Sequence, residues 1–91
     1  MIEPVESHPL VHFWREDGGN YHLDVRELLL AGGEPYAYII DCARQVGRGE
    51  RLHVHAVFEP KPLMRQAERM GLSASCAREE ADHWICTLVR G

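Results

Sequence analysis

Residues 51–58 read RLHVHAVF, and this stretch decides the fold. Apolar residues alternate with histidines, which is the period of a β-strand with one apolar face and one polar face. The apolar side holds Leu52, Val54, Ala56 and Phe58, and the other side holds His53, His55 and Val57. The EPKP run at 59–62 ends the strand, because proline cannot donate to a strand ladder. The pattern predicts a strand that faces helices on one side and presents histidine on the other.

Proline and glycine divide the rest of the chain and predict one helix on each side of this strand. Residues 35–46 begin with Pro35, which suits a first helical turn, and end before Gly47. The apolar residues of this helix have the i, i+3, i+4, i+7 spacing of a single buried face. They are Tyr36, Ile39, Ile40 and Ala43. A second helix is expected over residues 62–70, with Leu63, Ala67 and Met70 on its buried face and Gly71 at its end.

Four further segments have strand patterns. Residues 10–14 and 21–25 predict a β-hairpin with a glycine-bearing loop, and residues 27–33 after it are expected to form a short apolar connection. Residues 73–78 and 83–90 predict two strands joined by an acidic turn at 79–82. The last strand is apolar on both faces, which indicates a central place in the sheet.

The expected order is therefore an extra leading strand followed by β-α-β-α-β-β. Right-handed crossovers place both helices on the same side of the sheet. The predicted fold class is α/β: a two-layer sandwich with a mixed sheet, two helices on one face and the other face open. Residues 1–20 are interpreted as an N-terminal extension with the added strand, and residues 21–91 as the domain itself.

Composition excludes several classes of protein for these 91 residues. The chain has 14 acidic and 10 basic side chains, which argues against the basic surface that nucleic-acid binding requires. Neither a signal peptide nor a run of about 18 apolar residues is evident, so a cytoplasmic protein without membrane contact is expected. Three cysteines without a Cys-x-x-Cys pair predict reduced and mostly buried thiols rather than disulfides or a zinc ribbon.

Several short motifs resemble the TusA/SirA-like superfamily, and within it a branch of uncharacterised small domains. They are LDVREL at 23–28, EP at 34–35, the strand that follows GE at 49–50, and PKPL at 60–63. The resemblance covers about residues 21–90. It implies the same two-layer sandwich, with the first strand of the domain at an edge and the last strand between the second and third. It also implies a redox or metal-related setting, because this branch is often associated with hemerythrin-type or cupin-type iron proteins.

The sulfur carriers of this superfamily have a Cys-Pro-x-Pro motif at the start of their first helix. A helix N-terminus can lower the pKa of a thiol there and favour persulfide transfer. The matching residues 32–35 read GGEP, so Gly32 replaces the cysteine while Glu34 and Pro35 remain in the motif. The resemblance therefore implies a retained fold, with Pro60 and Pro62 at the second helix, but no persulfide chemistry at Gly32.

Two cysteines remain candidates for a displaced sulfur carrier. Cys42 falls on the helix at 35–46 and Cys76 on the strand at 73–78. Neither has the position at a helix N-terminus that activates a thiol. Inert thiols are the preferred interpretation, and a persulfide carrier with an atypical cysteine stays open as an alternative.

Histidine is the sharper candidate, because six of the 91 residues are histidine. Alternation places His22, His53, His55 and His83 on the open face of the sheet, together with Asp24. If their strands are neighbours, about 4.8 Å apart, the imidazoles can converge on one zinc or iron ion with bonds of about 2.0–2.1 Å. The alternative is a hydrated polar face that carries ordinary surface histidines.

The sequence favours a small accessory or binding domain that has no catalytic residues. A sulfur carrier and a metal-binding protein are the two alternatives. The open face is also a candidate surface for a homodimer or a protein partner, and the alternative is that the leading hairpin covers this face within one chain. The apolar residues expected at that surface are Phe13, Trp14, Val57, Ile85 and Val89.

Overall fold

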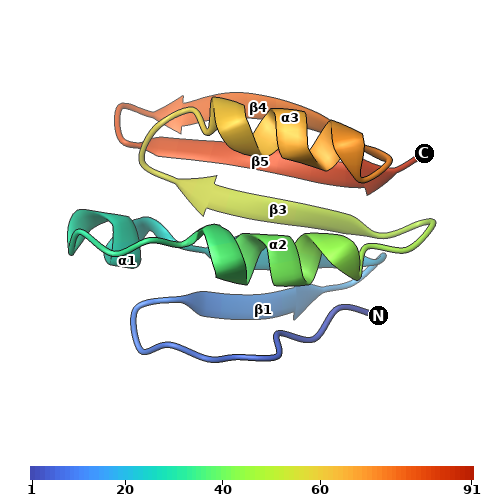
Figure 1. Ribbon diagram of the computed structural model, residues 1–91, viewed down its shortest axis with the longest axis horizontal. Coiled ribbons are helices and arrows are strands. Elements are labelled where there is room, and N and C mark those ends of the chain that lie inside the picture. Colours follow the sequence, from blue (N-terminus) through green and yellow to red (C-terminus); the bar gives the residue numbers. More distant parts are fainter.

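The computed structural model describes all 91 residues and confirms the two-layer α/β sandwich (Figure 1). One layer is a mixed sheet of five strands: β1 His12–Glu16, β2 Asn20–Asp24, β3 Arg51–Ala56, β4 Leu72–Glu80 and β5 His83–Arg90. The helices are α1 Arg26–Leu30, α2 Tyr36–Arg44 and α3 Lys61–Arg69. In Figure 1, α2 and α3 both lie in front of the sheet, so the opposite face of the sheet is left open.

The strand order in the sheet is β1-β2-β3-β5-β4. The β2–β3 pair is parallel, and the other three pairs are antiparallel. The last strand, β5, lies between β3 and β4, which confirms the prediction that it is central. The first strand of the domain, β2, is an interior strand here, because the added β1 pairs with it along its full length.

The core lies between the sheet and the two longer helices. Leu52 and Val54 of β3 and Leu88 of β5 are completely buried there, as the alternation in residues 51–58 predicts. From the other layer, α2 contributes Ile39 and Ile40 to the same cluster. Because burial of apolar surface is the main favourable term in folding, the alternation of β3 fixes which face of the sheet the helices cover.

The short helix α1 departs from the sequence prediction. Residues 27–33 were expected to form an irregular connection, but residues 26–30 complete a helix after the N-cap residue Val25. Leu28 is buried, and packing stabilises so short a helix where intrinsic propensity cannot. Gly32 then adopts a φ of 82°, which glycine accepts without steric cost, and the chain turns toward α2.

Other boundaries differ by about two residues. β3 ends at Ala56, so Phe58 lies outside the ladder with 53% of its surface exposed instead of joining the core. Tyr36 is likewise exposed at the start of α2, although the spacing placed it on the buried face. β4 continues to Glu80, so the predicted acidic turn at 79–82 shrinks to residues 81–82.

Candidate functional site

The open face of the sheet gathers the four histidines that the sequence places there. His22 lies on β2, His53 and His55 on β3, and His83 on β5. His22 pairs with His53 across the parallel strands, and their rings stack with centroids 4.7 Å apart. The condition set by the sequence prediction, that these three strands are neighbours, is met by the order β2-β3-β5.

Three of these histidines and one glutamate form a continuous line across four strands. The carboxylate of Glu16 on β1 contacts Nε2 of His22. Nδ1 of His22 lies 2.9 Å from Nε2 of His55, and Nδ1 of His55 lies 2.8 Å from Nε2 of His83. Both separations are those of hydrogen bonds. We call Glu16, His22, His55 and His83 the histidine row.

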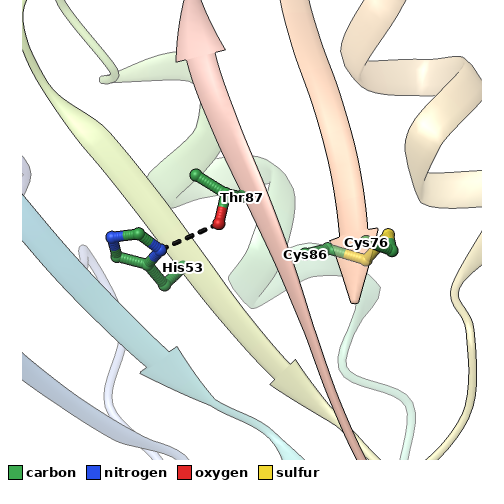
Figure 2. Close-up of a disulfide and its surroundings, with 4 residues drawn as sticks. All are labelled: His53, Cys76, Cys86 and Thr87. Carbon is green, nitrogen blue, oxygen red and sulfur yellow. Dashed lines mark hydrogen bonds between the residues drawn. A yellow bond between two sulfur atoms is a disulfide. The ribbon is translucent and has the colours of Figure 1, made fainter. Parts of the chain in front are cut away.

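His53 lies beside the row and has its own partners. Its Nδ1 forms a hydrogen bond with Oγ1 of Thr87, drawn as a dashed line in Figure 2, and the two atoms are 2.9 Å apart. Its Nε2 is 3.0 Å from Oδ1 of Asn20. The Asn20 carbonyl oxygen accepts only, so Nε2 of His53 carries the hydrogen and Nδ1 accepts from the Thr87 hydroxyl. Both ring nitrogens of His53 are therefore engaged within the sheet.

The imidazoles do not converge on a single point. Their nitrogens face one another in pairs, and His55 uses both of its nitrogens on two different neighbours. Nowhere in the chain do three or more His, Cys, Asp or Glu side chains assemble in a way that could hold a metal ion. Asp24 lies opposite His55, as expected, but its carboxylate is bound by Arg26, with Nη2 and Oδ2 2.8 Å apart. The geometry supports a hydrogen-bonded row in preference to a zinc or iron site.

Burial keeps the centre of the row uncharged. His55 is only 6% exposed, and this desolvation lowers its pKa to about 4, with the charges of His22 and His83 acting in the same direction. Burial also lowers the pKa of His53 below its ordinary value. For Asp24, burial alone would raise the pKa, but hydrogen bonds from Arg26 hold it below the ordinary range. At neutral pH His55 is therefore a neutral imidazole.

Trp14 extends the ring stacking to the edge strand. Its ring is parallel to that of His22, with centroids 4.8 Å apart and an interplanar angle of 1°. Phe13 points to the opposite face and packs against the core, because neighbouring residues of a strand alternate between faces. The expectation that both aromatic residues flank the open face is therefore wrong for Phe13.

The cysteines also differ from the sequence prediction. Cys76 and Cys86 lie directly opposite each other on β4 and β5 and form a disulfide (Figure 2). Cys42 is free and completely buried, and burial raises its pKa to about 12. Neither predicted thiol, Cys42 or Cys76, is thus an accessible thiolate. The sequence contained a signal for this disulfide. Residues 76 and 86 are equidistant from Ala81 in the turn, and residues equidistant from a hairpin turn lie opposite each other on its two strands.

Thiol counting tests this arrangement. Under non-reducing native conditions, a thiol-reactive probe is expected to label none of the three cysteines rapidly, since Cys42 is buried and protonated. After unfolding without reductant one thiol should react, and after unfolding with reductant three should react. Mass spectrometry of the alkylated protein provides the count. Three reactive thiols in unreduced, unfolded protein isolated from cells would contradict the disulfide.

A cavity of about 460 Å³ opens at one end of the sheet, beside the starts of α2 and α3. Eight of its twelve lining residues are hydrophobic, and Glu34 is the one charged residue among them. Four of the five motif positions named from the sequence line it: Glu34, Pro35, Pro60 and Pro62. Gly32 is not in the lining. The sequence contained a signal for this site, because both proline-bearing helix starts flank the strand at 51–56.

These features define the class of protein: a two-layer α/β domain with an apolar cavity at one end of its sheet and a histidine row on its open face. The sequence model of the protein family DUF2249, described as an uncharacterized conserved protein, matches residues 22–90. The chain therefore belongs to this family. The strand β1 precedes the matched segment. No curated protein and no solved structure matches the chain. None of its helices has the length and apolar character needed to cross a membrane.

Proposed function

We propose that this chain is a small non-catalytic binding domain whose ligand occupies the apolar cavity. The cavity itself is the observation that carries the proposal, because its volume of about 460 Å³ falls within the range of about 300–1,000 Å³ typical of small-molecule sites. It lies at the carboxyl ends of the parallel strands β2 and β3, where open α/β sheets commonly bind ligands. This end of the sheet therefore has the size and the position of a ligand site.

The lining indicates the kind of ligand. The walls are mainly aliphatic and proline side chains, and two exposed aromatic residues, Tyr36 and Phe58, also line the cavity. Removing apolar surface from water contributes roughly 25 cal/mol per Å². A small organic molecule of mainly apolar character gains most from such a site.

The titratable side chains of the lining favour binding over catalysis. They are Glu34 and Tyr36. Oε1 of Glu34 accepts a hydrogen bond of 2.9 Å from the backbone N–H of Tyr36, so this carboxylate is engaged at the start of α2. A general base must reach a proton on the reacting group, and a carboxylate held by its own helix is poorly placed for that task.

The sulfur-carrier alternative has less support. In the superfamily that the sequence resembles, the cysteine sits at the position of Gly32, whereas Cys42 is buried and Cys76 is in a disulfide. One observation, the Cys76–Cys86 disulfide, supports a role in a redox-related process. Disulfides are rare in the cytoplasm of most organisms, so the thiol count on protein isolated from cells also tests the expected cytoplasmic location.

Filling the cavity tests the proposed function. Indole, an uncharged aromatic probe, is expected to bind saturably and to shift the amide signals of the lining residues in NMR spectra. Ala56 lines the cavity and is almost completely buried, so Ala56→Leu places three further carbon atoms in the empty space. This variant is expected to weaken indole binding at least 10-fold while the fold is retained, because a filled cavity has no room for the ring.

The matched control is Ala77→Leu, which adds the same atoms at an exposed position on β4. It should bind indole as the unmodified protein does. Circular dichroism confirms that both variants are folded. Indole shifts that are absent, or that persist unchanged in Ala56→Leu, would contradict a ligand site in the cavity.

A further inference from the structure

The ring nitrogens of the histidine row determine how many protons it can hold. The three imidazoles have six ring nitrogens, and four of them form the two imidazole–imidazole hydrogen bonds. Each such bond needs one N–H donor and one lone pair. The remaining two nitrogens are the ends of the row: Nε2 of His22 and Nδ1 of His83.

Glu16 sets the direction of the row. Nε2 of His22 is buried, lies against the Glu16 carboxylate and makes no other hydrogen bond. A carboxylate repels a lone pair and attracts an N–H, so this nitrogen carries the hydrogen. Nδ1 of neutral His22 must then accept from His55 Nε2–H, and Nδ1 of His55 must accept from His83 Nε2–H. The row ends in a lone pair on Nδ1 of His83.

This arrangement has room for one additional proton. A proton added at Nδ1 of His83 leaves both imidazole–imidazole bonds intact, and the Glu16 carboxylate at the other end partly balances its charge. A second additional proton has no free nitrogen, because both remaining lone pairs, on Nδ1 of His22 and of His55, already accept hydrogen bonds. Its uptake must break a bond of the row.

We propose that the histidine row is a binding site for a single proton, and that a second proton breaks it and releases Trp14 from the histidine face. The row would then be a pH-sensitive connection between β1, which supplies Glu16 and Trp14, and the family domain, which supplies the three histidines. β1 lies outside residues 22–90 that match the family, so Glu16 and Trp14 come from outside the matched segment.

Charged groups from several elements face the row. They are Glu16 of β1, Asp24 of β2, His53 and Arg51 of β3, Arg26 at the start of α1, and Glu80 of β4, which lies opposite His83. The three carboxylates favour proton uptake, whereas Arg26, Arg51 and a protonated His53 oppose it. Burial also lowers the pKa of His55, the central ring, which has no free nitrogen.

Histidine NMR on the full chain tests the proposal, because two-bond ¹⁵N couplings report which nitrogen of each ring carries hydrogen. At pH 8, the rings of His22, His55 and His83 are all expected to be Nε2–H tautomers. On acidification the three rings should first share one proton and take up a second only at least about one pH unit lower, as coupled groups do. The Trp14 side-chain signal should move with the second step.

Glu16→Gln removes the negative charge that orients the row. Its matched control is Glu79→Gln, at an exposed position on β4. In Glu16→Gln, the three rings should no longer share one tautomer. The midpoint of the first protonation step should fall by about 0.5 pH unit, which is the scale of an exposed ion pair. The control should leave both unchanged. Three independent titrations with mixed tautomers, an unaltered Glu16→Gln variant, or stoichiometric Zn²⁺ that shifts all three rings together would each overturn the proposal.

Discussion

Between pH 6.5 and pH 4, the free energy of unfolding is expected to fall by about 2–3 kcal/mol. The cause is His55, whose pKa is about 4 in the folded protein and 6.5 when the chain is unfolded. In this interval the unfolded chain binds more protons than the native one, so acid favours unfolding. The contribution is complete above pH 6.5 and is lost as the pH falls toward 4. A shift of this size corresponds to about 3 kcal/mol, which water at the rim of the face reduces somewhat.

Urea unfolding followed by circular dichroism at a series of pH values measures this effect. His55→Gln keeps a neutral hydrogen-bonding side chain at the position and should flatten the dependence between pH 6.5 and 4. His12→Gln, at an exposed position on β1, is the matched control and should retain the dependence of the unmodified protein. A stability that stays constant over this interval would show that His55 accepts a proton freely in the fold.

Two carboxylates make the free energy of unfolding fall further below pH 4. Burial alone would raise the pKa of Glu50, but hydrogen bonds from the Met1 amino group, the Gly47 N–H and the Tyr21 hydroxyl hold it below its ordinary value. Asp24 is lowered in the same way by Arg26. The stability from these two groups is present above their unfolded pKa values near 4 and is lost as the pH falls further. The two pH ranges separate the histidine effect from the carboxylate effect.

Replacing Leu52 by alanine is expected to lower the free energy of unfolding by about 3–4 kcal/mol. Leu52 is completely buried at the centre of the sheet, on β3 between β2 and β5. The loss combines the transfer free energy of the deleted carbon atoms with the cost of the space left behind. A protein of this size has a total stability of about 5–13 kcal/mol, so this single change removes a large share of it.

Leu30→Ala is the control for this substitution. Leu30 is the last residue of α1 and is 76% exposed, so the same chemical change there should alter stability by less than about 0.5 kcal/mol. Denaturant unfolding at pH 7.5 measures both variants on a common scale. A loss below about 1.5 kcal/mol for Leu52→Ala would mean that the core collapses around the missing side chain.

Local patterns predicted much of the fold because each pattern reflects a local physical constraint. Alternation in residues 51–56 identified the face that the helices cover, and the doubly apolar residues 83–90 identified a central strand. The helix α1 was missed because its five residues are stabilised by the burial of Leu28 and by contacts of α1 with β3, which a local pattern does not reveal. Phe58 was misplaced because β3 ends at Ala56, and only the course of the backbone toward Pro60 determines that end.

The candidate site was predictable in its membership and not in its bonding. Alternation alone placed His22, His53, His55 and His83 on one face, and the structure brings all four together. Which nitrogen faces which neighbour depends on strand register and ring orientation. Those features pair the rings through hydrogen bonds instead of converging them on an ion. Register likewise placed Cys76 opposite Cys86, where the sequence predicted separate thiols.

The sequence by itself determined the layers, the central strand and the histidine face, because these follow from the periods of strands and helices and from the burial of apolar side chains. Only the tertiary structure decided the apolar cavity, the disulfide and the histidine row. Each of these depends on atoms from segments distant in the chain, and their separations are set by packing. The alternation decides which side chains of a strand face the helices, because the apolar face must be buried. Which residues then lie opposite one another on neighbouring strands depends on the exact pairing and on ring orientation, and both are decided by packing in the folded chain.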